Sequence, residues 1–271
     1  MAIPEFETLT LSVEEQVATV ALNRPDKANS MNAVMWPELQ ACFEWLDAEP
    51  GVRAVVLAGN GKHFCSGLDL AMFSGLGGES GDPARRAEAF RRNVLRMQDN
   101  LSAIEQCRKP VLAAIHNTCI GGGVDLVCCC DMRYATEDAW FAIREIDIGM
   151  TADVGTLQRM PKLVADGIVR ELAYTGRNMD AKEARELGFV NRVFPDRETL
   201  LREVTIIARG IARKAPLAVR GTKEMILYAR DHSVRDGLNY IATWNAGMLS
   251  EVDLMAGVQA QASKQQASFE D

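Results

Sequence analysis

Three acidic residues lie in apolar stretches of this 271-residue chain. Asp125 lies in the apolar run VDLVCCC, Glu145 follows the segment FAIR, and Asp153 lies in TADVG. A carboxyl group among apolar side chains has a raised pKa and can exchange protons near neutral pH. Structural roles remain open at this point, since Asp153 could cap a helix over 154–160 and Glu145 could form a salt bridge with its neighbouring arginine.

Two glycine-containing loops each follow an apolar segment that indicates a buried strand. The first has the sequence HFCSGLDL over residues 63–70, and the second contains the glycines of residues 121–123. Successive glycines let the backbone approach a ligand, and a helix N-terminus offers free N–H donors. The two loops could each give one N–H to the same oxygen and so stabilise an oxyanion. A tight strand-to-helix turn is the alternative for the glycines, whose spacing does not match a dinucleotide-binding loop.

Metal-binding and nucleophile motifs are absent from the sequence. The histidines at positions 63, 116 and 232 are scattered, with no HxxxH pair, GxSxG motif or P-loop. Seven cysteines, three of them consecutive at 128–130, form no CxxC pair, and their number is odd. We therefore expect buried free thiols in a reducing compartment, no metal and no cofactor.

Alternating and helical spacings predict the elements that position these residues. The expected strands are a hairpin over 5–22 and segments 54–58, 111–115, 131–135 and 189–193, and the expected helices are 31–48, 84–106 and 122–130. The recurring order strand–loop–helix–strand indicates one α/β core over residues 1–195 that carries binding and catalysis. The mostly helical remainder, 196–271, has apolar faces that a lone domain would leave exposed, so we expect it to form an oligomer.

Composition and charge narrow the class of protein. Hydrophobic residues make up 48% and charged residues 25%, and the net charge is −7. These values are typical of a globular protein and disfavour nucleic acid or an anionic membrane as partner. No apolar run reaches the length of a membrane span. The N-terminal residues lack a secretory pattern and the C-terminal SFED is not a peroxisomal signal, so we expect a cytoplasmic location.

Three motifs together resemble one known family over about residues 8–269. They are HFCSGLDL, KPVLAAIHNTCIGGGVDLVCCCDMRYA and FAIREIDIGMTADVGTLQRMP. The sequence resembles the crotonase (enoyl-CoA hydratase/isomerase) superfamily. The resemblance implies an α/β spiral of ββα turns with a helical C-terminal extension that builds a homotrimer or hexamer. It also implies acyl-CoA thioesters as substrates, so that coenzyme A is part of the substrate and not a cofactor.

The resemblance also implies roles for residues of the two glycine loops. The backbone N–H groups of Ser66 and Gly122 are expected to form the oxyanion hole. The expected substrate-binding residues are Cys65, Gly67, Leu68, Asp69, Gly121, Gly123 and Lys264, the last as a phosphate contact.

The acidic residues distinguish subclasses within the family. Hydratases have Glu at the positions of Asp125 and Glu145 and usually lack an acid at Asp153, whereas all three acids here resemble those of the Δ3,5-Δ2,4-dienoyl-CoA isomerases of fatty acid β-oxidation. That likeness implies that Glu145 removes a proton from C2, that Asp153 delivers one at C6, and that Asp125 assists electrostatically. The alternatives are an enoyl-CoA hydratase, in which Asp125 and Glu145 hold a water, and a non-catalytic or RNA-binding relative, which the acidic composition disfavours.

Overall fold

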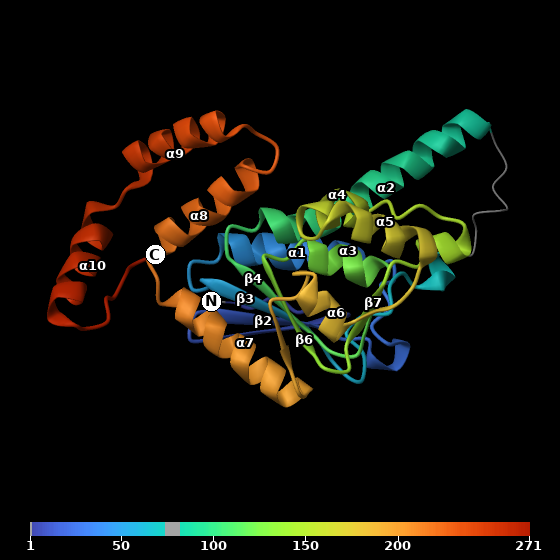
Figure 1. Cartoon of the computed structure of the whole chain (residues 1–271), viewed down its shortest axis with the longest axis horizontal. Coiled ribbons are helices and arrows are strands. Elements are labelled where there is room, and N and C mark those ends of the chain that lie inside the picture. The colour runs from blue at the N-terminus through green and yellow to red at the C-terminus, as the bar shows by residue number, and fades with distance from the viewer. Residues whose placement is uncertain (1, 74–81) are drawn as a thin grey trace.

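The computed structural model describes residues 2–73 and 82–271, and its centre is a six-stranded sheet (Figure 1). The strands lie in the order β1-β2-β3-β4-β6-β9, and only β1 and β2 run antiparallel. Their bounds are β1 (Leu9–Glu14), β2 (Val17–Leu22), β3 (Ala54–Gly59), β4 (Val111–Ile115), β6 (Met132–Thr136) and β9 (Arg192–Phe194). A smaller sheet has the order β5-β7-β8, with β5 (Thr118–Ile120), β7 (Trp140–Ala142) and β8 (Met179–Asp180).

Helices cover both faces of the large sheet, which explains why its central parallel strands β3 and β4 are apolar and buried throughout. In β3, Val55 and Leu57 belong to the larger hydrophobic cluster, which includes residues of α1 (Met35–Ala48), α2 (Pro83–Gln106) and α3 (Gly122–Cys128). Val56 points the other way and packs with residues of α7 (Arg197–Ala212). Side chains alternate between the faces of a strand, so a single apolar run serves both layers.

The chain repeats one unit, in which a strand of the large sheet is followed by a short strand of the small sheet and then a helix. β4, β5 and α3 form one such unit, and β6 and β7 lead towards α4 (Thr156–Arg159), α5 (Asp166–Thr175) and α6 (Ala181–Glu186). The described residues also include 3-10 helices at Pro25–Lys27, Leu70–Phe73, Glu145–Ile148 and Met160–Lys162. The predicted α/β spiral of ββα turns is confirmed, and the small sheet sets where the two glycine loops leave the core.

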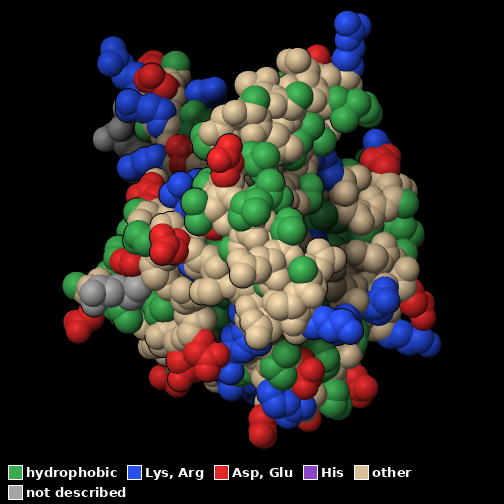
Figure 2. All heavy atoms as spheres, turned by 90° about the vertical axis from the view of Figure 1, so that its left-hand side faces the viewer, with side chains coloured by type: hydrophobic (Ala, Val, Ile, Leu, Met, Phe, Trp, Pro, Cys, Tyr) green, Lys and Arg blue, Asp and Glu red, His purple; other side chains and the backbone are tan. Residues whose placement is uncertain are grey.

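The C-terminal extension leads away from the core as α8 (Pro216–Tyr228), α9 (Val234–Met248) and α10 (Glu251–Ser263) (Figure 1). Neither α9 nor α10 has a buried residue. Hydrophobic side chains gather on this side of the molecule (Figure 2); the exposed ones include Val234, Leu238, Leu249, Val252 and Met255. The expected boundary at residue 195 places α7 in the extension, whereas α7 packs on the sheet, so the exposed part begins with α8.

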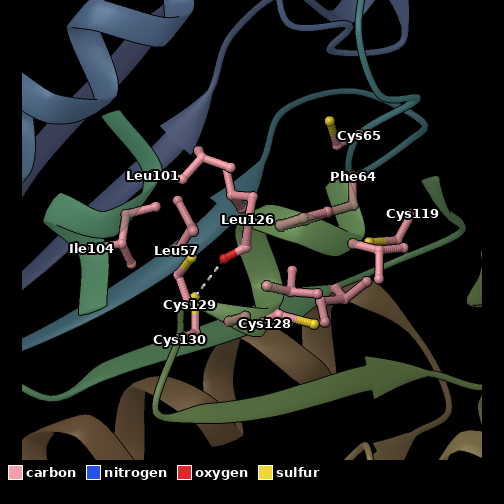
Figure 3. Packing of buried hydrophobic residues seen from close by; sticks show 14 of the residues in the cluster. Leu57, Phe64, Cys65, Leu101, Ile104, Cys119, Leu126, Cys128, Cys129 and Cys130 are labelled. Carbon is pink, nitrogen blue, oxygen red and sulfur yellow. Dashed lines mark hydrogen bonds between the residues drawn. The ribbon is translucent and has the colours of Figure 1, made fainter. Parts of the chain in front are cut away.

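The seven cysteines are free and buried, as predicted. Cys128 ends α3 and Cys129 and Cys130 follow it. All three pack among leucine and isoleucine side chains, where the Cys130 thiol donates to the Leu126 carbonyl at 3.6 Å (Figure 3). Burial raises the pKa of Cys128 and of Cys130 to about 12. Among the helices of residues 2–73 and 82–271, none is long and apolar enough to cross a membrane.

Candidate active site

Three segments meet around a cavity of about 160 Å³. They are the loop after β3, the N-terminus of α3, and the chain between β7 and α4. Asp125, Glu145 and Asp153 all line this cavity. Its apolar wall consists of Trp36, Leu68, Leu70, Met97, Ile120, Ile148, Met150 and Val154. The structure therefore brings the three acids of the sequence together beside an apolar slot that suits a hydrocarbon chain.

Asp125 is completely buried at the start of α3. Its Oδ1 accepts the backbone N–H of Thr156 at 2.6 Å, while its Oδ2 has no hydrogen-bond partner. Burial raises the pKa of Asp125 to about 7, the Thr156 contact opposes this rise, and the nearby Glu145 carboxylate adds to it. Asp125 therefore satisfies the first free N–H of α4. The N-cap residue of this helix is Gly155 and no side chain caps it from that position, so the alternative that Asp153 is its N-cap is wrong.

Glu145 begins a 3-10 helix directly after β7, and its buried Oε2 has no hydrogen-bond partner. Burial raises the pKa of this carboxyl group. The salt bridge to Arg144 that the sequence left open is not formed, because Arg144 donates to Asn178 at 2.8 Å and lies over the Trp140 ring. A carboxylate with one free oxygen and a raised pKa is suited to removing a proton near neutral pH.

Gly121 lets the first turn of α3 approach this base. Its φ is +51°, in the region that favours glycine, and a Cβ atom at Gly121 would lie 3.1 Å from Oε1 of Glu145. A side chain here would therefore meet both backbone strain and the carboxylate.

Asp153 is partly exposed and lines the same cavity, and burial raises its pKa as well. Its backbone carbonyl accepts a hydrogen bond from Nε2 of Gln98, a residue of α2, at 2.6 Å. With three carboxyl groups of raised pKa at one cavity, protons leave the set in coupled steps. One group can then stay protonated while another is ionised, which is what an acid–base pair requires.

The structure corrects one of the two expected oxyanion-hole donors. The backbone N–H of Ser66 donates to the carbonyl of Ala28 at 3.0 Å, so this donor is already used inside the protein. Ser66 lines the cavity, but its N–H is not available to a substrate oxygen.

Leu68, two residues later, has the geometry expected of Ser66. Leu68 forms a parallel bridge with Met31. In this bridge the Met31 N–H donates to the Gly67 carbonyl at 2.8 Å, and the Asp69 N–H donates to the Met31 carbonyl at 3.0 Å. The N–H of Leu68 itself therefore points to the opposite side. A Cβ atom at Gly122 would lie 3.6 Å from the Leu68 nitrogen. In the described residues, neither the Leu68 nor the Gly122 N–H donates to a protein acceptor, and both residues line the cavity.

The other expected substrate-binding residues divide into two groups. Gly67 and Gly121 line the cavity. Cys65, Asp69 and Gly123 lie behind it and hold the loops in place: the Cys65 thiol donates to a backbone carbonyl, Asp69 pairs with an arginine at 3.0 Å, and Gly123 packs against Cys65.

Lys264 is not brought to the cavity within one chain, because it terminates α10 in the extension. Sequence reasoning also missed Gln98, Trp36 and Met97. Gln98 lies on a polar helix face without any motif, and the two apolar residues have the helical spacing of core positions.

Asp125 makes the stability of the protein depend on pH. Its pKa is near 7 in the folded protein and about 3.8 when exposed, so the folded state binds the proton more tightly. This contribution to the free energy of unfolding is complete below pH 4 and is lost as the pH rises through 7. Asp125→Asn keeps an acceptor for Thr156 without the charge. We expect the free energy of unfolding of wild type, relative to that of the variant, to fall by up to about 1.4 kcal/mol for each unit by which the pH rises in this window. Urea unfolding at a series of pH values measures both free energies. Parallel pH curves for the two proteins would contradict the assignment.

The sequence profile of the enoyl-CoA hydratase/isomerase family matches residues 12–271. The chain belongs to the enoyl-CoA hydratase/isomerase family. One similar member is the mitochondrial Delta(3,5)-Delta(2,4)-dienoyl-CoA isomerase of Pongo abelii, 48% identical over 94% of this chain and 79% of that protein. Another is the peroxisomal Delta(3,5)-Delta(2,4)-dienoyl-CoA isomerase of Arabidopsis thaliana, 44% identical over 99% of each chain. The crystal structure of an enoyl-CoA hydratase from Bacillus anthracis superposes with a TM-score of 0.89 at 31% identity, over 97% of this chain and 99% of that one.

These family members contradict the expected cytoplasmic location. Their names place one in mitochondria and the other in peroxisomes. The expectation rested on the absence of recognisable targeting patterns, and such an absence does not identify a compartment.

Proposed function

We propose that this enoyl-CoA hydratase/isomerase family member converts 3,5-dienoyl-CoA to 2,4-dienoyl-CoA in fatty acid β-oxidation. The observation that carries the proposal is the set of three carboxyl groups with raised pKa at one apolar cavity, beside two free backbone N–H groups. The similar proteins named as dienoyl-CoA isomerases support the same reaction.

The chemistry requires a base and an acid at separate points along the acyl chain. Glu145 takes the C2 proton, and the electron pair of the broken C–H bond is delocalised over the thioester oxygen, C4 and C6. The Leu68 and Gly122 N–H groups stabilise the oxygen as its negative charge develops. Asp153 gives its proton to C6, which leaves double bonds at C2 and C4. Glu145 is then protonated and Asp153 ionised, and proton exchange restores the starting state.

Hydration of a 2-enoyl-CoA is the second candidate, and it has less support. A hydratase needs two carboxylates that share one water, which leaves no role for Asp153 at the cavity. The named isomerases are also more similar to this chain than the hydratase of known structure, at 44–48% against 31% identity. RNA binding without catalysis has no observation in its favour.

The test is incubation with 3,5-octadienoyl-CoA and, separately, with crotonyl-CoA, in buffer that contains EDTA. We expect the absorbance of a conjugated 2,4-diene to appear in the first reaction, since the mechanism uses only carboxyl and backbone N–H groups. Water addition to crotonyl-CoA without diene formation would instead establish the hydratase.

We also propose that the protein is a homo-oligomer, either a trimer or a hexamer. The exposed hydrophobic side chains of α9 and α10 support this, because soluble monomers rarely expose apolar patches of such extent. We expect light scattering to give three or six times the mass of one chain. A monomer at micromolar concentration would refute the proposal.

A further inference from the structure

One face of α2 holds the segment that carries Asp153. Gln98, Ser102 and Glu105 are spaced by four and three residues, which places them on the same side of a helix. Gln98 Nε2 donates to the backbone carbonyl of Asp153 at 2.6 Å. Ser102 Oγ accepts from Nη2 of Arg159 at 3.1 Å, and Glu105 pairs with Nε of the same arginine at 3.0 Å.

Arg159 also contacts the backbone of the residues that follow Asp153. A Cβ atom at Gly155 would lie only 2.0 Å from Nη1 of Arg159, so the guanidinium group covers the backbone there. On the other side, Asp125 of α3 accepts the N–H of Thr156. The backbone from 153 to 156 is therefore fixed between two helices, at a point where Asp153 lines the cavity.

We infer that Gln98 is a positioning residue for proton delivery at C6, acting through the backbone of Asp153. The inference rests on the proposed function. The Gln98 amide donates a hydrogen bond to the backbone carbonyl of Asp153 and not to its carboxyl group. Gln98 therefore affects where the carboxyl group lies. Glu145 lies eight residues before Asp153, in the 3-10 helix Glu145–Ile148, and in the described part of the chain it forms no hydrogen bond with Gln98, while the Leu68 and Gly122 N–H groups come from two other loops. Loss of the Gln98 contact therefore disturbs the second proton transfer and spares the first.

The experiment compares two proton-transfer rates in D2O for wild type, Gln98→Leu and Gln106→Leu. Gln98 and Gln106 both lie on α2 and both line a groove of about 660 Å³. Gln106 is exposed and, among the described residues, forms no hydrogen bond with the Asp153 segment, so it is a matched control. Deuterium incorporation at C2 of recovered 3,5-octadienoyl-CoA reports the first step, and diene absorbance reports the complete reaction.

For Gln98→Leu we expect isomerisation to fall by up to about 10²-fold, because small displacements of a reacting group have effects of this size. C2 exchange and KM should stay close to wild type, so the ratio of exchange to isomerisation rises. Gln106→Leu should leave the ratio unchanged. Gln98→Ala repeats the test without the bulk of leucine, and retained C2 exchange shows that the rest of the site is intact.

Two results would overturn the role of Gln98 while the proposed function stands. One is an unchanged ratio in both Gln98 variants, and the other is an equal loss of exchange and isomerisation. A wild-type protein that forms no diene would reject the proposed function itself and this inference with it.

Discussion

Asp153→Asn should bind acyl-CoA and exchange the C2 proton with D2O, but should isomerise about 10²–10⁴-fold more slowly than wild type. Asparagine keeps the shape of the side chain and the backbone contact to Gln98, but it has no proton to give to C6. Glu145 and the backbone donors at Leu68 and Gly122 are unaltered, so the first step continues. The measurement pairs deuterium incorporation at C2 with the rate of diene formation.

Glu145→Gln is the complementary variant, since it removes the base of the first step. We expect it to abolish exchange and isomerisation together, because no dienolate forms. Near-normal turnover by Asp153→Asn would refute the two-carboxylate mechanism and leave an isomerase with a single base or a hydratase.

Leu68→Pro should slow C2 exchange and isomerisation together by about 10²–10³-fold, the usual effect of losing one oxyanion-hole donor. Proline has no backbone N–H. The bridge to Met31 uses only the Gly67 carbonyl and the Asp69 N–H, so the substitution removes none of its hydrogen bonds. The same two rates that test Asp153 test this variant.

Leu68→Ala is the matched control, because it shortens the side chain at the cavity and keeps the N–H. We expect a change in KM and little change in the chemical steps. If Leu68→Pro were folded and as active as Leu68→Ala, the second donor would have to be another group.

The larger elements of the core follow from sequence periodicity, and the small sheet does not. The helix predicted over 84–106 is α2 (Pro83–Gln106), and the strand over 111–115 is β4 (Val111–Ile115). β5 and β7 have three residues each and β8 has two, too short for an alternating pattern to be visible. The strand expected over 189–193 lies at Arg192–Phe194, because Phe189 and Val190 are buried in the core without joining the sheet.

At the site, side-chain chemistry was more predictable than backbone direction. Asp125, Glu145 and Asp153 were recognised because carboxyl groups among apolar residues are unusual. Which of Ser66 and Leu68 offers its N–H depends on the pairing of each residue with Ala28 or Met31. That pairing is a tertiary property with no local signal in the sequence.

The buried thiols beside the site make conformational opening measurable without any added label. Alkylating reagents attack the thiolate, and burial raises the pKa of Cys65 and of Cys128 to about 12. Cys129 also donates to the backbone carbonyl of Asp125 at 3.3 Å, which connects it to α3 beside the cavity. Modification of these cysteines therefore has to wait for local unfolding, and its rate follows the population of opened molecules. A substrate analogue that bridges the segments around the cavity should slow that modification in proportion to its occupancy.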